Sequence, residues 1–200
     1  MDSISIIIPT ANKRPEGLKR CLDSIEKLDY PKELITVQVI VDEPRKGLSA
    51  RLKEGTDRAT GDWVVFASDD VEFTPDCLKN VLKGMKDNNK KYASFNTGDV
   101  YPDQGNINEH MIIHKDLIAG LPDKSIFDLR LNHIGTDNVL WARMKKIGQN
   151  YRCNEAILKH YHFTKPGGKM DDTYMLAWRE DMVKKDRETM KKIMGEEGLV

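Results

Sequence analysis

Two adjacent carboxylates, Asp69 and Asp70, follow the apolar run Trp63–Ala67, at the point where a strand is expected to end. Mg²⁺ and Mn²⁺ prefer oxygen ligands, and their sites commonly combine one or two carboxylates with the phosphates of a substrate. The pair could therefore supply the protein's share of a divalent-metal site. A solvated turn is the alternative, because aspartate side chains often bond backbone N–H groups after a strand. Taken alone, the pair favours the turn.

Two further places carry residues that could do chemistry. Asp137 could act as a general base if its carboxylate lies within hydrogen-bond reach of the group that loses a proton. Asp137 or Thr136 could instead cap the helix that begins there, and the residues alone favour the cap. His160 and His162 end an apolar strand, where an imidazole could complete the shell of a metal ion or have only a structural role. The spacing leaves the choice between the two histidines open.

The apolar patterns predict which elements position these residues. Short β-branched runs indicate strands, and apolar residues spaced three to four apart indicate helices. Strand and helix alternate in the first half of the chain, which is typical of a parallel sheet with right-handed crossovers. The predicted strands there are Ser3–Ile8, Ile35–Val41 and Trp63–Ala67, and the predicted helices lie around Leu18–Leu28, at Leu48–Ala59 and from Pro75 onward.

The second half of the chain is less regular, and we predict one domain over residues 1–200. Its predicted elements are strands at Tyr92–Asn96, Met111–His114 and Ala156–Tyr161, a helix at Thr136–Ile147 and one long amphipathic helix at Asp171–Met194. In open α/β sheets, ligands bind beyond the carboxyl ends of the strands. Thr10, Asp42 and the Asp69–Asp70 pair all follow predicted strands, so we expect them at one rim of the sheet.

The composition limits the classes of partner. Lys plus Arg and Asp plus Glu both number 32, which gives zero formal net charge and disfavours a nucleic-acid-binding protein. The three cysteines lack the CxxC or Cys/His spacing of a zinc site. The N-terminal stretch MDSISIIIPT lacks a basic leader, and no apolar run approaches the roughly 20 residues that cross a bilayer. We expect a soluble, cytoplasmic protein, compatible with a peripheral position at a membrane; the sequence does not indicate its oligomeric state.

Several short motifs occur in the order seen in one enzyme family. In the first half they are Ser5–Thr10 (SIIIPT), Val39–Asp42 (VIVD), Leu48–Arg51 (LSAR), Ala59–Asp62 (ATGD) and Phe66–Asp76 (FASDDVEFTPD). In the second half they are Gly135–Asp137 (GTD) with Leu140 and Arg143, Ile147–Gly148, and His160–His162 (HYH). Together they resemble the GT-A glycosyltransferases, in particular the large family-2 group of inverting enzymes. The resemblance covers most of the chain outside roughly residues 101–108.

This resemblance implies the GT-A fold, an α/β fold with a Rossmann-like, mainly parallel central sheet flanked by helices. Residues 1–100 would form the half that binds the nucleotide sugar, residues 101–170 the acceptor side and residues 171–200 a C-terminal helix. Only Glu43–Gly47 joins Asp42 to Leu48, where the family normally has an additional helix and strand. The sheet is therefore expected to be one edge strand shorter than usual.

The resemblance also implies a reaction and the residues that perform it. A sugar would pass, with inversion, from a nucleotide-diphosphate donor, by default a UDP-sugar, to a saccharide or other hydroxyl acceptor. Asp137 would be the general base. Asp70 corresponds to the last acid of the DxD motif and would bind Mn²⁺ or Mg²⁺, with His160 favoured over His162 as a further ligand. The residues implied to hold the donor are Pro9, Thr10, Asp42, Arg51, Ser68 and Asp69.

Two departures from the family pattern leave other functions open. Ser68 stands where the first acid of the DxD motif usually lies, and Thr136 replaces the glutamate that usually precedes the base. A catalytically degenerate sugar-nucleotide-binding protein is therefore one alternative. A nucleotidyltransferase is another, although Ala11–Gly17 (ANKRPEG) carries fewer glycines than a phosphate loop of that class. A receiver-like signalling domain ranks last, because its paired acids would directly follow the first strand, where Pro9–Thr10 stand.

Overall fold

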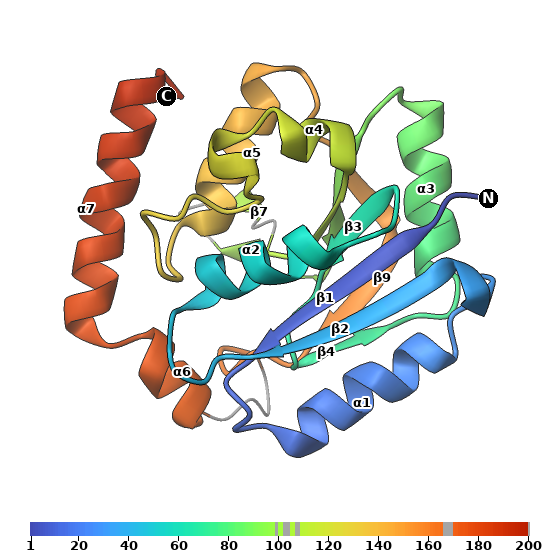
Figure 1. Cartoon of the computed structure of the whole chain (residues 1–200), viewed down its shortest axis with the longest axis horizontal. Helices are drawn as coiled ribbons and strands as arrows, with labels where there is room; N and C mark the ends of the chain where they lie inside the picture. Colours follow the sequence, from blue (N-terminus) through green and yellow to red (C-terminus); the bar gives the residue numbers. More distant parts are fainter. Residues whose placement is uncertain (99, 102–104, 107–108, 166–169, 200) are drawn as a thin grey trace.

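The computed structural model describes residues 1–98, 100–101, 105–106, 109–165 and 170–199, and strands and helices alternate along most of the chain (Figure 1). The strands are β1 Ile4–Thr10, β2 Ile35–Val41, β3 Trp63–Phe66, β4 Val71–Phe73, β5 Tyr92–Asn96, β6 Val100–Tyr101, β7 Gly105–Asn106, β8 Met111–His114 and β9 Arg152–His160. The α-helices are α1 Pro15–Glu26, α2 Leu48–Arg58, α3 Cys77–Asp87, α4 Lys115–Ala119, α5 Thr136–Lys146, α6 Asp172–Ala177 and α7 Glu180–Glu197. Short 3-10 turns lie at Lys32–Leu34 and Pro122–Lys124. Within the described ranges, no helix is both long enough and apolar enough to cross a bilayer.

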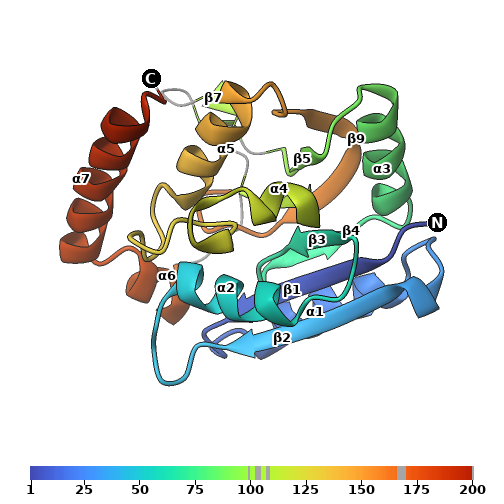
Figure 2. The same ribbon diagram turned by 45° about the horizontal axis from the view of Figure 1, so that its top comes forward.

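Seven strands of the described chain form one sheet in the order β2-β1-β3-β8-β5-β9-β4. β1, β2 and β3 run parallel, β8 runs antiparallel between β3 and β5, β9 is parallel to β5, and β4 is antiparallel to β9. All strands except β4 and β8 therefore point the same way, which confirms the predicted mainly parallel α/β sheet. β2 forms one edge, because the short segment Glu43–Gly47 leads directly from β2 into α2 (Figure 2).

Helices cover both faces of the sheet, so its central strands are apolar on both sides. Side chains alternate between the faces of a strand, and in β1 this places Ile4, Ile6 and Ile8 in one cluster and Ile7 in another. The first cluster contains residues of α1 and α3, and the second contains residues of α2, α4 and α5. The unbroken apolar run of β1 follows from this burial on both faces.

The carboxyl ends of the parallel strands meet at one rim of the sheet, as predicted. β1 ends at Thr10, and β3 ends at Phe66, directly before Ser68–Asp70. β2 ends beside β1, where the backbone N–H of Asp42 donates to the carbonyl of Thr10 at 2.8 Å. Three polar segments that are far apart in sequence therefore lie at one rim.

The antiparallel strands bring further polar residues to the same rim. Because β8 runs in the opposite direction, it begins there: Met111 pairs with Phe66, and Glu109–His110 precede it. β9 ends there as well, since His160 pairs with Val71, the first residue of β4. The strand β4, which the sequence patterns did not predict, thus places the acidic pair beside the end of β9.

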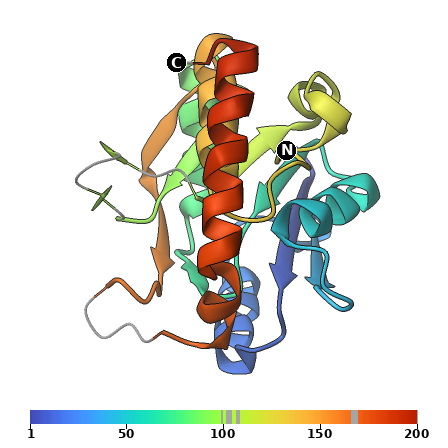
Figure 3. The same cartoon turned by 90° about the vertical axis from the view of Figure 1, so that its left-hand side faces the viewer.

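The C-terminal part forms two helices rather than the single helix predicted for Asp171–Met194. α6 and α7 are separated at Arg179, whose backbone has φ −56° and ψ 133° and so leaves the helical region. Asp171 and Tyr174 contact residues at the rim of the sheet, whereas α7 packs against α5 (Figures 1 and 3). The break gives the two segments different directions, and Met175 of α6 is 55% exposed.

Candidate functional site

A cavity of about 600 Å³ opens at this rim. β1, β3 and β9 contribute side chains from their carboxyl ends, α5 contributes its first turn, and α6 and α7 form another wall. The predicted site residues that line the cavity are Pro9, Thr10, Ser68, Asp69, Asp70, Asp137 and His160. It is also lined by residues that the sequence did not assign to the site, among them Arg14, Glu109, His110, His133, Tyr174 and Arg187. The cavity therefore brings the acidic pair and the predicted base together.

Asp42 and Arg51 are the two predicted donor-binding residues that do not line this cavity. Arg51 Nε donates to Asp42 Oδ1 at 2.9 Å, and Arg51 Nη1 donates to Glu54 at 2.8 Å. Asp42 also accepts a hydrogen bond from the backbone N–H of Lys46 at 2.7 Å, which organises the connection from β2 to α2. The backbone hydrogen bond between Asp42 and Thr10 places this ion pair next to the cavity along the rim.

Asp69 is held against the end of β1. Its Oδ2 accepts a hydrogen bond from Thr10 Oγ1 at 2.5 Å, and its Oδ1 accepts one from Arg14 Nη1 at 3.2 Å. Burial raises the pKa of Asp69, and the neighbouring charge of Asp70 adds to the effect, while the bonds from Thr10 and Arg14 oppose it. The side chain is buried by its partners yet keeps contact with the cavity.

Each oxygen of Asp70 has two polar neighbours. Oδ2 accepts hydrogen bonds from Arg14 Nη1 at 2.7 Å and from the hydroxyl of Tyr174, and Oδ1 accepts one from Ser68 and lies 3.5 Å from His160 Nε2. Burial alone would raise the pKa of Asp70, but His160 and Arg14 hold it well below its usual range. Asp70 is therefore an ionised carboxylate in a dense network, and a metal ion bound to it has to displace one of these partners.

Arg14 is the cation of this network, and the sequence motifs did not place it in the site. Its Nε and Nη2 donate to the two carboxylate oxygens of Asp171 at 2.6 and 3.1 Å, and its guanidinium lies 3.9 Å from the centre of the Tyr174 ring. Arg14 thus ties the loop after β1 to the start of α6. Its partners lie 55 to 157 positions away in the sequence, so no local pattern marks it.

Glu109, His110 and His160 form a second group beside the acidic pair. Their potential ligand atoms all lie within 4.8 Å of one another. His160 Nδ1 lies 3.1 Å from Glu109 Oε2, and the rings of His110 and His160 meet edge to face with centres 4.9 Å apart. One carboxylate and two imidazoles are donors that first-row divalent metals accept, so these residues fit a divalent cation. No sequence motif marked Glu109 and His110, because they precede an antiparallel strand rather than follow a parallel one.

The two histidines between which the sequence left the choice open both line the cavity but have different surroundings. β9 ends at His160, so His162 lies beyond the regular strand. His162 Nδ1 lies 2.8 Å from Thr164 Oγ1, and its ring centre is 4.8 Å from that of Tyr174. His160 therefore faces the acidic pair, whereas His162 packs against α6.

Asp137 lies in the first turn of α5, whose N-cap residue is Gly135. Neither Asp137 nor Thr136 is therefore the cap, which was the alternative that the sequence favoured. Asp137 lines the cavity and keeps a partly exposed surface inside it. Burial raises its pKa to about 7, and the negative charge of Glu109 adds to the effect. A carboxylate that titrates near neutral pH is suited to general-base catalysis.

If Asp137 is the base, the pH dependence of turnover should report its raised pKa. The carboxylate accepts a proton only when ionised, so kcat/KM is expected to fall about tenfold per pH unit below pH 7 and to level off above it. An ordinary aspartate would place this limb near pH 4. Initial rates from about pH 5 to about pH 9 test the prediction, and a flat profile over that range would contradict it.

Asp186 of α7 holds the segment that leads into α5. Its carboxylate accepts hydrogen bonds at 3.0, 2.8 and 2.9 Å from the consecutive backbone N–H groups of Asn132, His133 and Ile134. Asp186 is 1% exposed, so water does not compete for these bonds. Gly135 follows with φ 78°, a left-handed conformation that favours glycine. The C-terminal helix therefore positions the start of α5, and the sequence motifs did not reveal this role.

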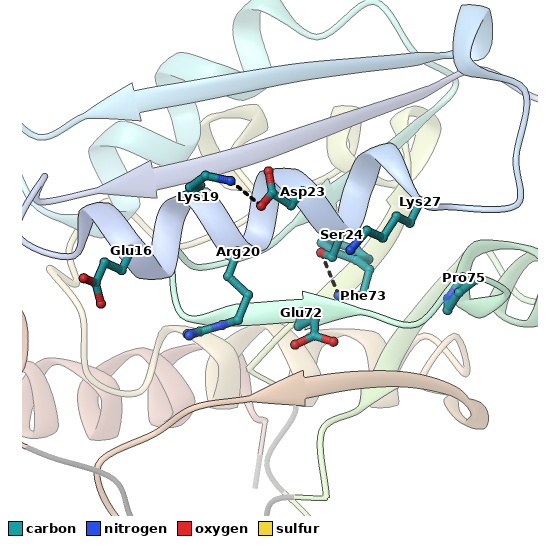
Figure 4. Close-up of a pocket in the computed structure, with 9 residues that line it drawn as sticks. All are labelled: Glu16, Lys19, Arg20, Asp23, Ser24, Lys27, Glu72, Phe73 and Pro75. Atoms are coloured by element: carbon teal, nitrogen blue, oxygen red, sulfur yellow. Dashed lines mark hydrogen bonds and ion pairs between the residues drawn. The ribbon is translucent and has the colours of Figure 1, made fainter.

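A second hollow, of about 410 Å³, lies between α1 and β4 and shares no lining residue with the first (Figure 4). Its lining residues are Glu16, Lys19, Arg20, Asp23, Ser24, Lys27, Glu72, Phe73 and Pro75. Lys19 pairs with Asp23 at 2.5 Å, and Ser24 Oγ accepts the backbone N–H of Phe73 at 3.0 Å. It contains none of the residues predicted to do chemistry, so we assign the functional site to the larger cavity.

Comparison with known proteins agrees with this architecture. The sequence model of glycosyl transferase family 2 matches residues 32–145. A search of curated proteins found no match. Among solved structures, the chain is similar to the mannosyltransferase PcManGT from Pyrobaculum calidifontis in complex with GDP-Man and Mn²⁺, with a TM-score of 0.65 and 18% identity, covering 80% of this chain and 56% of that one. It is also similar to S. aureus TarS, with a TM-score of 0.62 and 15% identity, covering 78% of this chain and 36% of that one.

These structural similarities show a shared fold at low sequence identity. The chain spans 56% of the length of the PcManGT chain and 36% of the TarS chain. The family match is independent of them, includes Asp69, Asp70 and Asp137, and covers more than half of the 200 residues. The chain therefore belongs to glycosyl transferase family 2.

Proposed function

We propose that this protein transfers a sugar, with inversion, from a nucleotide-diphosphate donor to a hydroxyl group of an acceptor. The observation that carries the proposal is the cavity that Asp137 shares with Asp69 and Asp70. A carboxylate with a pKa of about 7 suits the removal of a proton from a hydroxyl group under attack. The rim at which the cavity opens is where open α/β sheets bind nucleotides. Membership of glycosyl transferase family 2 supports the same reaction class.

In the proposed reaction, Asp137 accepts the proton of the acceptor hydroxyl while the hydroxyl oxygen attacks the anomeric carbon of the donor. The new C–O bond forms on the face opposite the leaving group, so the configuration at that carbon inverts. The bond from the anomeric carbon to the diphosphate oxygen breaks, and its electron pair leaves with the nucleoside diphosphate. Asp137 returns the proton to solvent after the product departs.

The donor is proposed to lie along the rim of the sheet. Pro9–Thr10 and Ser68–Asp69 line the cavity and would face its sugar and phosphates. Asp42 and Arg51, next to Thr10 along the rim, would contact the nucleotide. A UDP-sugar is our first choice of donor. One similar structure contains GDP-Man and another, TarS 1–349 at a TM-score of 0.55, contains UDP, so both nucleotides belong in the test.

A divalent cation, Mn²⁺ or Mg²⁺, is proposed to bind at Asp70 and His160, whose facing atoms lie 3.5 Å apart. When bound, such an ion would act as a Lewis acid that stabilises the charge on the departing diphosphate. Arg14 lines the same cavity and carries a positive charge beside Asp70. We propose that its guanidinium also faces the donor phosphates, because planar guanidinium groups match phosphate oxygens.

A sugar-nucleotide-binding protein without transfer activity is the second candidate. It is favoured because the carboxylate of Asp70 already has close polar contacts, with Arg14, Tyr174, Ser68 and His160. If these contacts persist when the donor binds, the cation has no access to Asp70. Such a protein would bind the donor but would neither hydrolyse nor transfer it.

Thermal unfolding of the purified chain with UDP-glucose, UDP-GlcNAc and GDP-mannose, each with and without Mn²⁺, tests donor binding. A specific donor at a hundredfold excess over its Kd stabilises the fold by about 2.7 kcal/mol. Release of nucleoside diphosphate by the stabilising donor, in the presence of candidate saccharide acceptors, then separates the two candidate functions. Binding without release would support the non-catalytic protein, and no stabilisation by any of the three would count against the donor class.

A further inference from the structure

We propose that Glu109, His110 and His160 form a nitrogen-rich divalent-cation site that selects first-row transition metals, such as Mn²⁺, Co²⁺ or Zn²⁺, over Mg²⁺. Any catalytic role of this cation rests on the proposed function. Binding of the cation can be measured whether or not the protein transfers a sugar. The site would use Nδ1 of His160, the nitrogen that faces Glu109, whereas the Asp70 position proposed above faces Nε2 of the same ring.

The three side chains are close enough to share one ion. Ligand atoms at about 2.1 Å from a common metal lie at most about 4.2 Å apart. The potential ligand atoms of this group lie within 4.8 Å of one another, so small side-chain rotations bring them into range. His160 Nδ1 already lies 3.1 Å from Glu109 Oε2, and the ring centres of His110 and His160 lie 4.9 Å apart.

Both imidazoles of the group are buried. His160 is the last residue of β9, His110 directly precedes β8, and the two residues are 7% and 3% exposed. Packing around a buried imidazole restricts its orientation, which is what a binding site requires. Glu109 is more accessible, with 24% of its side chain exposed, and gives the group access to the cavity.

This group leaves the network of Asp70 intact. Both oxygens of Asp70 already face hydrogen-bond donors, including the guanidinium of Arg14 at 2.7 Å, so a cation at Asp70 competes with a salt bridge. A cation between Glu109, His110 and His160 does not require that exchange. It would still lie next to the acidic pair, because His160 Nε2 is 3.5 Å from Asp70 Oδ1 and His110 Nε2 is 3.5 Å from Ser68 Oγ.

The donor types decide which cation binds. Mg²⁺ prefers oxygen ligands in a near-octahedral arrangement and usually keeps several of its waters. Imidazole nitrogen suits the later first-row metals, whose affinity for such sites rises along the series from Mn²⁺ to Cu²⁺. Two imidazoles and one carboxylate therefore disfavour Mg²⁺ relative to Mn²⁺, Co²⁺ and Zn²⁺. The alternative is that Glu109 and His160 simply form an ion pair that no metal enters.

Titration of the full chain with Co²⁺, followed by its visible absorption and by calorimetry in the absence of nucleotide, tests the proposal. We expect one equivalent to bind, Zn²⁺ and Mn²⁺ to compete for the same site, and a large excess of Mg²⁺ to leave the Co²⁺ spectrum unchanged. Glu109→Gln and His110→Gln should each weaken Co²⁺ binding at least about tenfold. His114→Gln, at the far end of β8, is the matched control and should bind as the wild type does.

Other outcomes overturn the proposal. No stoichiometric Co²⁺ binding, equal affinity for Mg²⁺ and Co²⁺, or unchanged binding by both Glu109→Gln and His110→Gln would each do so. Thermal unfolding of every variant without metal shows whether it is folded, and Glu109→Gln keeps the test valid if the buried His110 variant is not. Sugar transfer with normal cation dependence in both variants would contradict the cation site and leave the proposed function supported. Tight, selective Co²⁺ binding in a chain that transfers no sugar would support the cation site and contradict the proposed function.

Discussion

Replacing Asp137 with asparagine is expected to lower the rate of sugar transfer by roughly 10²–10⁴ while leaving donor binding unchanged. The amide has nearly the shape of the acid but cannot accept a proton from the acceptor. The donor is proposed to contact the other side of the cavity, through Ser68–Asp69 and the end of β1. Single-turnover transfer and calorimetric donor binding measure the two effects separately. Retained turnover would remove the assigned role.

The same substitution is expected to stabilise the fold at neutral pH. The folded-state pKa of Asp137, about 7, lies above the ordinary value of 3.8, so ionising this residue opposes folding. The cost is absent near pH 4, grows as the pH rises toward 7 and is constant above it. Because the side chain is partly exposed in the cavity, we expect a gain of about 1–3 kcal/mol for Asp137→Asn at pH 8, less than the full shift implies.

Asp57→Asn, an exposed position on α2, is the matched control for both measurements. It removes the same charge outside the cavity, so transfer should be unchanged and the free energy of unfolding should change by less than about 0.5 kcal/mol. Urea unfolding of the three proteins at about pH 4 and at about pH 8 gives the comparison. A variant at position 137 that lost both activity and stability would indicate a structural role instead. A variant that loses activity and gains stability indicates a functional group that destabilises the fold.

Asp186→Ala is expected to lower the free energy of unfolding by about 3–5 kcal/mol. The change leaves three consecutive backbone N–H groups, at residues 132–134, without their carboxylate acceptor in a buried position. It also releases the turn that orients the first residues of α5, so transfer by the molecules that remain folded should fall as well. Urea unfolding followed by circular dichroism measures the loss of stability.

The control for this prediction lies on the same helix. Asp181 is exposed and pairs only with nearby Arg179 among the contacts that the structure describes, so Asp181→Ala should change stability by less than about 0.5 kcal/mol. A loss below about 1 kcal/mol for Asp186→Ala would mean that water reaches the freed N–H groups and replaces the carboxylate. The same result would show that α7 does not determine the position of α5.

These two residues explain why the C-terminal segment matters to the site. Asp186 holds the turn before α5, and Arg14 binds Asp171 at the start of α6. Two contacts with distant parts of the chain therefore stabilise the walls of the cavity. The contact of Arg14 joins residues more than 150 positions apart. The helical break between α6 and α7 allows both contacts, because one straight helix would direct the two ends along a single line.

The sequence predicted the elements well where local periodicity decides them. Strands β2, β5 and β8 have the predicted bounds, since each is a short apolar run between polar residues. The helix predicted at Asp171–Met194 was wrong in its continuity: its apolar spacing fits one helical period throughout, but the backbone leaves the helical region at Arg179. The strand β4 was missed because three residues are too few to show alternation.

By itself, the sequence determined the alternation of strands and helices, the sheet edge at which polar residues gather and the motifs that link Asp69, Asp70 and Asp137. Local spacing carries that information, because side-chain periodicity and strand ends depend on neighbours in the chain. Only the tertiary structure decided that Arg14 binds the carboxylate of Asp70 and that Glu109 and His110 lie beside His160. It also decided that burial raises the pKa of Asp137 to about 7. Strand direction and burial arise from contacts between distant segments. Strand direction and burial determine which charged groups lie close together and how far water is excluded from them. A local sequence pattern contains neither kind of information.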